Sequence, residues 1–562
     1  MLHEAVARSS IPLLSVALLV SSCGGAPLRP SAAREQDPAP PPLPWMAERD
    51  TLAPIESPAI ALAGGTILTA TGRIIEDGVL VMEDGLIVAV GARDEVEVPS
   101  GAEVVDVRGR FVTPGLIDTH SHMGVFPVPH LHGGADGNEM SGAATPGVRA
   151  ADGFWPQDPA LGRALAGGVT TIQVLPGSAN LIGGAGAILK LHLGRTVTEM
   201  ELPGAPETLK MACGENPKRV YGGRHQAPVT RMGSVHGYRA AFQAAREYGV
   251  SWREWQANHV GWQRERREHE AALREGDDEA DDPGPAPAPP ARDFGHERLL
   301  GAMEGRVLIQ MHCYRADEMA RMIEIGDELG FRVRAFHHAV EAYKIRDLLE
   351  ERGIGVSTWA DWWGFKLEAY DAIEENLALL TESGVRSVLH SDDSMLVQRL
   401  NQEAAKAMTA GRRAGIPITE DQALQWITSN AAWTLGIDDR TGTLEPGRMA
   451  DVVVWSASPF SVYSHADRVY VDGLLAYDRS APPRPSDFEL GQGLELVTVQ
   501  AYDDAAFLAA LSGSAPASER RGAYWTYVTR PSADVSPDQR RLGSRPPRAT
   551  ERLRELDERS AP

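Results

Sequence analysis

Cysteine is scarce in this sequence: among 562 residues there are only Cys23, Cys213 and Cys313. Cys213 and Cys313 each end an apolar run of the kind that forms a buried strand. We therefore expect both to be buried free thiols and not a disulfide bond. The length of the chain is sufficient to bury a large hydrophobic core.

Positive charge is also in short supply. Lysine and arginine number 55 against 77 aspartates and glutamates, which gives a formal net charge of -22 at pH 7. Phosphate backbones bind to basic surfaces, so this charge argues against nucleic acid as a partner. It also offers nothing to an anionic membrane surface. With 43% hydrophobic and 23% charged residues, the composition is that of a globular protein with a solvated acidic surface.

The apolar run near the N-terminus, IPLLSVALLV, has only ten residues. A membrane-spanning helix needs about 20, so this run has the length of a signal-peptide core. The following VSSC resembles a bacterial lipoprotein cleavage box, which would leave Cys23 as a lipid-modified N-terminus. We expect residues 1–23 to be a lipoprotein signal peptide, which would place the protein in the bacterial envelope as a periplasmic or outer-membrane lipoprotein. A plain secretory signal, and hence a secreted protein, is the alternative.

Composition changes along the chain predict its domains. Residues 24–56 are rich in Pro and Ala, which is typical of an extended linker. Residues 57–112 and 440–480 contain short β-branched runs, with turn signals such as EDG in the first, and these predict small β units. Residues 252–300 read as a charged helix followed by an acidic, Pro-rich and partly disordered segment. The polar residues 481–562 are expected to form a peripheral tail.

Between the two β segments, residues 113–439 contain apolar runs of strand length, and helical stretches precede several of them. The runs are GLIDTHSH (115–122), GVTTIQVL (168–175), AGAILKL (185–191), ETLKMAC (207–213), RVLIQMHC (306–313), RVRAFHH (332–338), GIGVSTW (353–359) and RSVLHSD (386–392). This alternation predicts an α/β fold with a parallel sheet. Eight strands are the number of a closed (β/α)8 TIM barrel. Residues 252–300 would then be an insertion between its fourth and fifth strands.

Several of these strands end in side chains that can bind a metal ion. His120 and His122 are two residues apart in the first strand, so their imidazoles point to the same side. The other strand-end residues are His312 in the fifth strand, His337 and His338 in the sixth, and Asp392 and Asp393 in the eighth. In a (β/α)8 barrel the C-terminal strand ends meet at one face, where the chemistry occurs. The pattern therefore predicts one metal site.

These motifs also carry a resemblance. VTPGLIDTHSHMG (112–124) is similar to the first-strand signature of the amidohydrolase superfamily, and GTLEPGRMADVVVW (442–455) resembles that superfamily's returning β segment. HCYRADE (312–318) and HHAVEAYK (337–344) look like its imidazolonepropionase- and prolidase-related branch. The resemblance implies a TIM barrel with a small composite β-sandwich domain, formed by the N- and C-terminal β segments.

The resemblance assigns a role to each strand-end residue. His120 and His122 would hold the more buried metal ion, and His312 and His338 would hold a second. Asp392 would contact a metal ion and act as the catalytic proton shuttle.

Two of these assignments have alternatives. We prefer His338 to His337 because the motif HAVEAY aligns from the second histidine. We prefer Asp392 to Asp393 because Asp392 directly follows the strand.

The fourth strand supplies a further candidate ligand, Lys210, with Glu215 just beyond the strand. In hydantoinase- and prolidase-like members of the superfamily, a strand lysine carboxylated by CO2 bridges two metal ions. An ordinary ammonium could not do so, because it is a donor only. Burial beside cations lowers the pKa of a lysine and frees the neutral amine that carboxylation requires. Glu215 could supply a carboxylate directly instead, and Lys210 could also simply extend to the rim.

The expected activity is hydrolysis of an amide or peptide bond, in a dipeptide or acyl-amino-acid-like molecule, or of a cyclic amide bond in a small-molecule substrate. Zinc lowers the pKa of bound water to about 7, and a second ion would polarise the carbonyl. Asp392 would take a proton from the water and return it to the leaving nitrogen. Mixed nitrogen and oxygen ligands fit one or two Zn2+ ions best, with Mn, Fe or Co as alternatives.

Substrate selection would lie in the loops. The basic loop after the fourth strand carries Tyr221, Arg224 and Arg231, whose arginines could bind a substrate carboxylate, and Tyr314 follows the fifth strand. A ring deaminase of the same superfamily is the rival enzyme; it would need a catalytic glutamate on the fifth strand, and Glu318 lies six residues past His312. A non-catalytic binding protein on the same fold is the third possibility, although such relatives usually lose ligands.

Overall fold

The computed structural model describes residues 39–46, 55–130, 132–481, 495–497 and 528–530. The predicted signal peptide lies outside these residues, as do most of the predicted linker and tail. Within the tail, the described strands β18 (Glu495–Val497) and β19 (Val528–Arg530) form an antiparallel pair. Among the described helices, none is both long enough and apolar enough to cross a bilayer.

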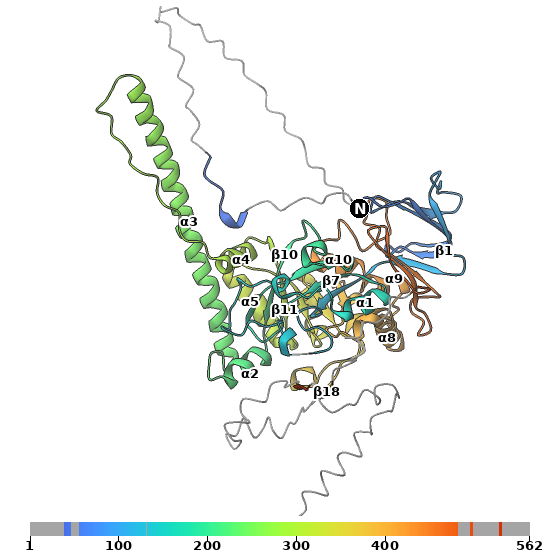
Figure 1. Cartoon of the computed structure of the whole chain (residues 1–562). Coiled ribbons are helices and arrows are strands. Elements are labelled where there is room, and N and C mark those ends of the chain that lie inside the picture. The colour runs from blue at the N-terminus through green and yellow to red at the C-terminus, as the bar shows by residue number, and fades with distance from the viewer. Residues whose placement is uncertain (1–38, 47–54, 131, 482–494, 498–527, 531–562) are drawn as a thin grey trace, which may run out of the picture. The chain divides into compact units, whose positions relative to one another are not determined.

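One sheet joins strands from both ends of the described chain. Its order is β17-β16-β15-β5-β1-β2-β3, with β4 beside β1. The strands are β1 (Ile60–Leu68), β2 (Ile74–Glu83), β3 (Leu86–Ala92), β4 (Glu103–Asp106), β5 (Phe111–Pro114), β15 (Val452–Trp455), β16 (Ala466–Val471) and β17 (Leu474–Asp478). The N- and C-terminal parts meet where β5 pairs antiparallel with β15, and Figure 1 shows these blue and orange strands side by side.

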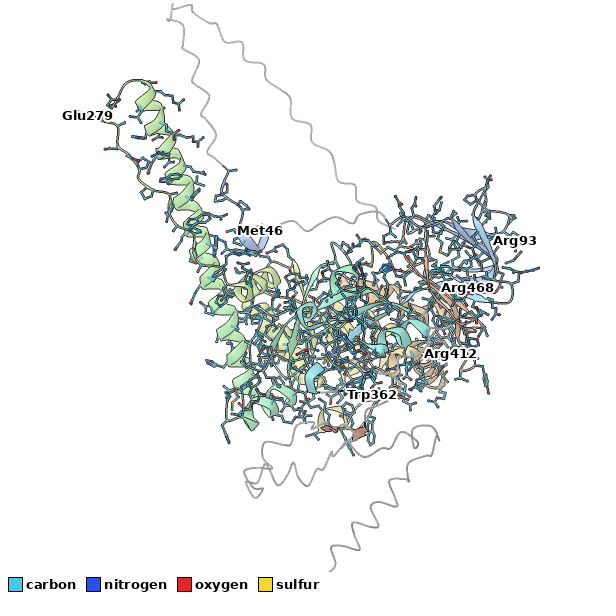
Figure 2. The ribbon with its side chains drawn as sticks, viewed as in Figure 1. Met46, Arg93, Glu279, Trp362, Arg412 and Arg468 are labelled. Carbon is cyan, nitrogen blue, oxygen red and sulfur yellow. A yellow bond between two sulfur atoms is a disulfide. The ribbon has the colours of Figure 1, made fainter. Side chains whose placement is uncertain are left out.

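Tight turns at Asp-Gly dipeptides build the hairpins of this sheet. Asp84 and Gly85 connect β2 to β3 with φ values of 50° and 75°, and Asp472 and Gly473 connect β16 to β17 with 49° and 74°. Two successive positive φ angles are the signature of the turn that matches the twist of paired strands, and Asp-Gly favours it. Figure 2 labels Arg93, just after β3, and Arg468 of β16 on this sheet.

The body of the α/β fold contains two further sheets, β6-β7-β9 and β14-β13-β12-β11-β10-β8. Their strands are β6 (Leu116–Ser121), β7 (Val169–Val174), β8 (Ile182–Ala185), β9 (Ala187–Lys190), β10 (Glu207–Ala212), β11 (Val307–His312), β12 (Val333–His337), β13 (Gly355–Thr358) and β14 (Ser387–Leu389). The helices outside the β10–β11 connection are α1 (Pro159–Ala166), α5 (Ala316–Leu329), α6 (Arg346–Glu351), α7 (Asn376–Glu382), α8 (Leu400–Arg413), α9 (Glu420–Gln425) and α10 (Ser429–Leu435). In Figure 1 they lie around the strands.

The expectation of a wholly parallel sheet is wrong at the third predicted strand. That run forms β8 and β9, which pair antiparallel with β10 and β7 respectively. A parallel pairing needs a crossover of about a dozen residues or more, usually with a helix, and residues 175–181 between β7 and β8 contain neither a helix nor a strand. The chain therefore turns back on β7. The remaining pairings, from β10 to β14 and between β6 and β7, are parallel.

The connection between β10 and β11 contains α2 (Glu215–Gly223), α3 (Arg231–Arg274) and α4 (Phe294–Met303). The charged helix that we expected from about residue 252 thus begins much earlier. Its first half buries Ser234, Tyr238, Phe242, Ala245, Gly249 and Trp252, which recur at intervals of three and four residues. This spacing places them on one helix face, which the scattered charges and glycines of the segment obscure in the sequence.

Candidate active site

Two histidines project from the end of β6. His120 is fully buried in the strand, and His122 follows it with 21% of its side chain exposed. The Nδ1 of His122 lies 2.7 Å from the carbonyl oxygen of Leu175. An Nδ1–H that donates to this carbonyl leaves Nε2 unprotonated and able to bind a metal ion. That Nε2 atom is 3.2 Å from Oδ1 of Asp392.

A second pair of side chains follows β14. Asp392 places Oδ1 3.7 Å from the Nε2 of His120, and its backbone N–H donates to the His120 carbonyl at 3.0 Å. Its φ of 52° lies in the left-handed region, which few non-glycine residues adopt. His390 is fully buried and places Nε2 2.8 Å from Nδ1 of His338. His390 was not among the predicted residues, although its spacing from Asp392 repeats that of His120 and His122.

The structure separates the roles of His337 and His338. The Nδ1 of His337 is 2.9 Å from the Nδ1 of His120, and its Nε2 is 2.7 Å from Oε1 of Gln310. Both of its ring nitrogens are therefore engaged, and His337 orients His120. His338 has a φ of 65°, and its ring lies against His120 and His312 with centroid distances of 4.4 and 4.6 Å.

Two groups of three side chains can offer a common ion one ligand atom each, all within 4.8 Å of one another. They are His120, His338 and His390, and His120, His122 and Asp392. Burial lowers the pKa of His120, His312 and His338 well below its usual value, and that of His390 to about 4. These rings are thus neutral at pH 7, the state in which an imidazole binds a metal ion.

His312 lies beside these groups. Its Nε2 is 3.5 Å from Nδ2 of Asn216. Its Nδ1, like the Nδ1 of His390, is buried without a hydrogen-bond partner in the described part of the chain. Buried nitrogen atoms left unpaired are costly. A metal ion would satisfy them, so the donor set fits a divalent cation.

Lys210 lies at the centre of the cluster. Its Nζ is 3.1 Å from the Nε2 of His120, and its side chain is 1% exposed. Burial lowers its pKa to about 7. Glu215, the alternative to Lys210, begins α2 and places Oε1 3.7 Å from Nζ of Lys366. Asp393, the alternative to Asp392, accepts hydrogen bonds from the backbone of the turn that follows it.

The side chains that we expected to bind substrate are mostly engaged. Tyr221 is buried and its hydroxyl donates to the carbonyl of Gly142. Arg224 donates to the carbonyl of Met140 at an exposed position. Arg231 forms ion pairs with Glu318 and Glu368, at 2.8 and 2.6 Å. Tyr314 alone of the four lies against the cluster, with its ring 5.1 Å from that of His312.

Cys213 and Cys313 form a disulfide bond in the structure, so the expectation of two free thiols is wrong. The parallel strands β10 and β11 are in register as far as Ala212 and His312. The next residue of each strand therefore faces the other, with Cα atoms 5.2 Å apart, which a disulfide spans readily. A separation of 100 residues concealed the pair, because sheet register alone brings the two together.

Asp118 also supports the site and was not predicted. It is fully buried on β6, where its Oδ1 accepts hydrogen bonds from the backbone N–H groups of His120 and Ser391 at 3.2 and 3.1 Å. Burial raises its pKa to about 6. The carboxyl group thus ties β6 to the segment that carries His390 and Asp392. A signal existed in the alternation Asp118, His120, His122, which places three polar side chains on one face of an otherwise apolar strand.

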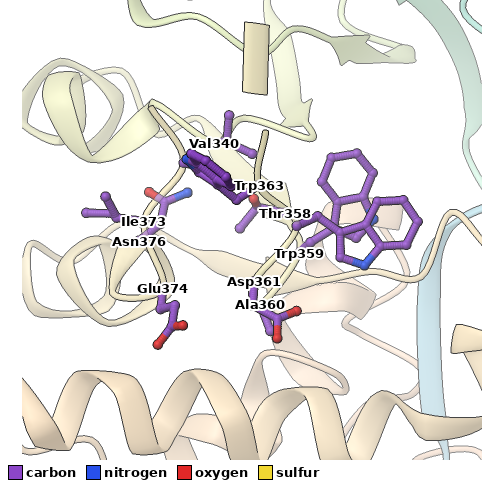
Figure 3. A pocket seen from close by; sticks show the side chains of 11 residues that line it. Val340, Thr358, Trp359, Ala360, Asp361, Trp363, Ile373, Glu374 and Asn376 are labelled. Carbon is purple, nitrogen blue, oxygen red and sulfur yellow. The ribbon is translucent and has the colours of Figure 1, made fainter. Parts of the chain in front are cut away.

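A cavity of 280 Å³ adjoins the cluster (Figure 3). Its lining includes Trp359, Trp362 and Trp363 from the loop after β13. The Trp359 ring is stacked between the rings of His338 and Trp362, with centroid distances of 4.5 and 4.7 Å. Trp359 is therefore a wall that the cavity and the histidine cluster share.

Comparisons with known proteins show the family of this chain. The sequence model of the Amidohydrolase family matches residues 292–477. A solved amidohydrolase structure from Thermotoga maritima MSB8 is 36% identical, with a TM-score of 0.64 over 75% of this chain and 100% of that chain. The chain therefore belongs to the amidohydrolase superfamily, a class of hydrolases with a TIM-barrel-like α/β fold.

Several curated relatives are named for different reactions. Amidohydrolase tasK of Hapsidospora irregularis is 35% identical over 71% of this chain, but the chain spans only 40% of its length. A 5-methylthioadenosine/S-adenosylhomocysteine deaminase of Symbiobacterium thermophilum is 25% identical, and an imidazolonepropionase of Mesorhizobium japonicum 26%, over 74% and 68% of this chain. The chain covers 89% and 87% of these two proteins. The relatives are hydrolases of carbon–nitrogen bonds in small molecules.

Proposed function

We propose that the protein is a metal-dependent hydrolase that cleaves an amide, peptide or cyclic amide bond of a small molecule. The observation that carries this proposal is the meeting of four histidines and Asp392 at the ends of β6, β12 and β14. Histidines that gather around a carboxylate, with a buried ring nitrogen of His390 unpaired in the described part of the chain, have no evident role in packing. Binding of a divalent cation would explain why these side chains lie together.

The fold that we propose around this site is a closed barrel. The described contacts run from β14 through β13, β12, β11 and β10 to β8, and from β9 through β7 to β6. Gly186 alone separates β8 from β9, and β14 also contacts β6. The order of strands thus returns to its start, which supports eight strands around one axis. The mixed sheet of β1–β5 and β15–β17 would be the small composite β domain.

His120, His122 and Asp392 would hold one metal ion, and His338, with His312 or His390, would hold another. Mixed nitrogen and oxygen ligands favour Zn2+, with Mn, Fe or Co as alternatives. Such an ion activates water and polarises a carbonyl group. With a pKa near 7, Lys210 supplies the neutral amine that carboxylation by CO2 needs, and the resulting carboxylate would complete the site.

Asp392 is the group that would move protons. Its carboxylate is held between His120, His122 and His338, at 3.7, 3.2 and 3.7 Å. Although burial acts to raise its pKa, the hydrogen bond with His122 and the charges of His122, His390 and Lys210 together lower it. Asp392 is therefore ionised at neutral pH and ready to accept a proton from water, which it would pass to the leaving nitrogen.

The test is elemental analysis of the purified protein followed by assay. We expect one or two equivalents of divalent metal, and hydrolysis of members of a library of dipeptides, acyl-amino acids and cyclic amides. Asp392→Asn should lower kcat about 100- to 10,000-fold. Asp393→Asn is the matched control and should leave kcat unchanged. Protein that binds no metal, or whose turnover is independent of Asp392, would refute the proposal.

Similarity to a deaminase supports ring deamination as a second candidate. Glu318, the glutamate that we considered for such a reaction, is engaged by Arg231 at 2.8 and 3.1 Å, which counts against it. Ammonia release from purine and pyrimidine nucleosides would distinguish the two reactions.

We also propose that the protein works in the bacterial envelope, anchored through Cys23. The disulfide between Cys213 and Cys313 supports an oxidising compartment, because such bonds are rare in the cytosol. Cys23→Ala should abolish incorporation of radiolabelled palmitate in cells. Labelling that persists in this variant would contradict the anchor.

A further inference from the structure

The arginines that the sequence suggested for a substrate carboxylate are not available for that task. Arg231 gives its guanidinium to Glu318 and Glu368, and Arg224 lies at an exposed position against the Met140 carbonyl. Another cation is in a better position. Lys366 belongs to the loop that follows β13, and only 14% of its side chain is exposed.

The ammonium group of Lys366 lies beside the His312 side of the cluster. It stands 3.7 Å above the ring of Tyr314 and 3.4 Å from Oδ1 of Asn216. Asn216 in turn places Nδ2 3.5 Å from the Nε2 of His312. The side chain of Asn216 thus links Lys366 to His312, a candidate metal ligand.

The present contacts of Lys366 leave it able to bind an anion. Charge-assisted hydrogen bonds are about 2.7–2.9 Å long, whereas Lys366 is 3.4 Å from Glu368 and 3.7 Å from Glu215. Glu368 also has a closer cationic partner in Arg231, at 2.6 Å. A carboxylate at normal hydrogen-bond distance would therefore pair with this partly desolvated ammonium better than its present neighbours do.

We propose that Lys366 binds a carboxylate of the substrate, which makes the substrate an N-acyl amino acid or a dipeptide. This inference rests on the proposed amide hydrolysis. In such a molecule the carboxylate is separated from the scissile amide by one carbon atom. With the amide at the histidine cluster, the carboxylate would reach the space between Asn216, Tyr314 and Lys366.

The experiment compares the most active N-acyl amino acid of the library with its carboxamide. In wild-type protein the acid should have the lower KM. Lys366→Met should raise KM for the acid roughly 10- to 100-fold, with kcat changed little and the carboxamide unaffected. Lys366→Arg should restore most of the affinity. Lys344→Met is the matched control: this lysine lies in the 3-10 helix Ala342–Ile345 after β12 and pairs with Asp371, and its loss should change KM for neither substrate.

Binding separates this inference from the proposed function. Calorimetry with N-acetyl-L-alanine and N-acetyl-L-alaninamide should show tighter binding of the acid by the metal-loaded protein, and Lys366→Met should abolish the difference. Equal loss for both ligands, or no loss for either, would overturn the role of Lys366. If the protein hydrolyses carboxamides and prefers them to acids, the proposed amide hydrolysis is supported and the binding of a substrate carboxylate by Lys366 is refuted. If it hydrolyses no carbon–nitrogen bond but still prefers the acid in a Lys366-dependent way, carboxylate binding by Lys366 is supported and the proposed reaction is refuted.

Discussion

Two lysines on neighbouring parts of the fold show how strongly partners decide what a buried charge does. Lys190 of β9 and Lys210 of β10 are 2% and 1% exposed. Lys190 lies 2.5 Å from Asp451 and 2.9 Å from Asp472, whereas Lys210 faces the imidazole of His120 at 3.1 Å. Burial acts to lower both pKa values. The two carboxylates outweigh it at Lys190 and raise its pKa, while the pKa of Lys210 falls to about 7.

The comparison separates a structural ion cluster from a chemical one. A charged lysine between carboxylates holds β9 to the segments that follow β14, where Thr441 also donates to Asp451 at 2.8 Å. A lysine whose pKa is about 7 loses its proton close to neutral pH, and its amine is then free to react. The same residue type, equally buried, thus stabilises the fold at Lys190 and is available for chemistry at Lys210.

The same substitution at each lysine is the most direct test of whether Lys190 and Lys210 have different roles. Lys190→Met leaves Asp451 and Asp472 buried without their cation, so the free energy of unfolding should fall by about 3 to 5 kcal/mol. Urea denaturation measures this. Arg239→Met, which removes an exposed ion pair with Glu328, should change stability little. Equal losses in the two variants would show that the buried cluster is not what holds these segments.

At Lys210 we expect the opposite result. Lys210→Met should lower metal content and reduce activity on the order of 1,000-fold, because the site loses a ligand of its ion. The free energy of unfolding of the metal-free protein should be maintained or rise, since methionine fills the space without a charge to bury. Full activity and metal content in this variant would remove Lys210 from the metal site.

The disulfide lies next to the chemical cluster and has a smaller effect. Cys213→Ser with Cys313→Ser should reduce the free energy of unfolding by about 2 to 4 kcal/mol. Because the bond joins the ends of β10 and β11, the variant should also lose some metal affinity. Ser234→Ala, a buried change on α3, controls for general disturbance. Mass spectrometry that finds two free thiols in the purified wild-type protein would contradict the bond itself.

The last effect concerns pH, and it is small over any single pH unit. In metal-free protein, the lowered pKa of Lys210 means that between about pH 7 and 10.5 the unfolded chain binds one more proton than the folded chain at this site. Stability of the wild type relative to Lys210→Met should therefore rise with pH in this window, by at most about 1.4 kcal/mol per pH unit. Below pH 7 both states are protonated and the difference should be constant. Parallel denaturation profiles across the window would show that the amine is not held neutral.

Local patterns were good guides to single strands and poor guides to pairings. The run GLIDTHSH forms β6 and ends in His120 and His122, because an apolar strand needs only its own residues to be recognised. The predicted direction of β8 and β9 was wrong, because the direction of these strands depends on the short connection from β7. The same limit applies to His337: its contacts with His120 and Gln310 come from strands far apart in the chain.

Side-chain availability was the hardest property to predict. Arg231 and Lys366 are both cations near the cluster, and nothing local distinguishes them. Only the fold shows that Glu318 and Glu368 engage the arginine.

The sequence by itself determined the superfamily, the strands and the residues that end them, because periodicity and motif are properties of neighbours along the chain. Tertiary structure alone decided that Cys213 pairs with Cys313, that His390 joins His338, and that Lys210 and Lys190 have opposite pKa shifts. The physical reason is that register and burial, which set distances between remote residues and the strength of their charges, exist only once the strands are side by side.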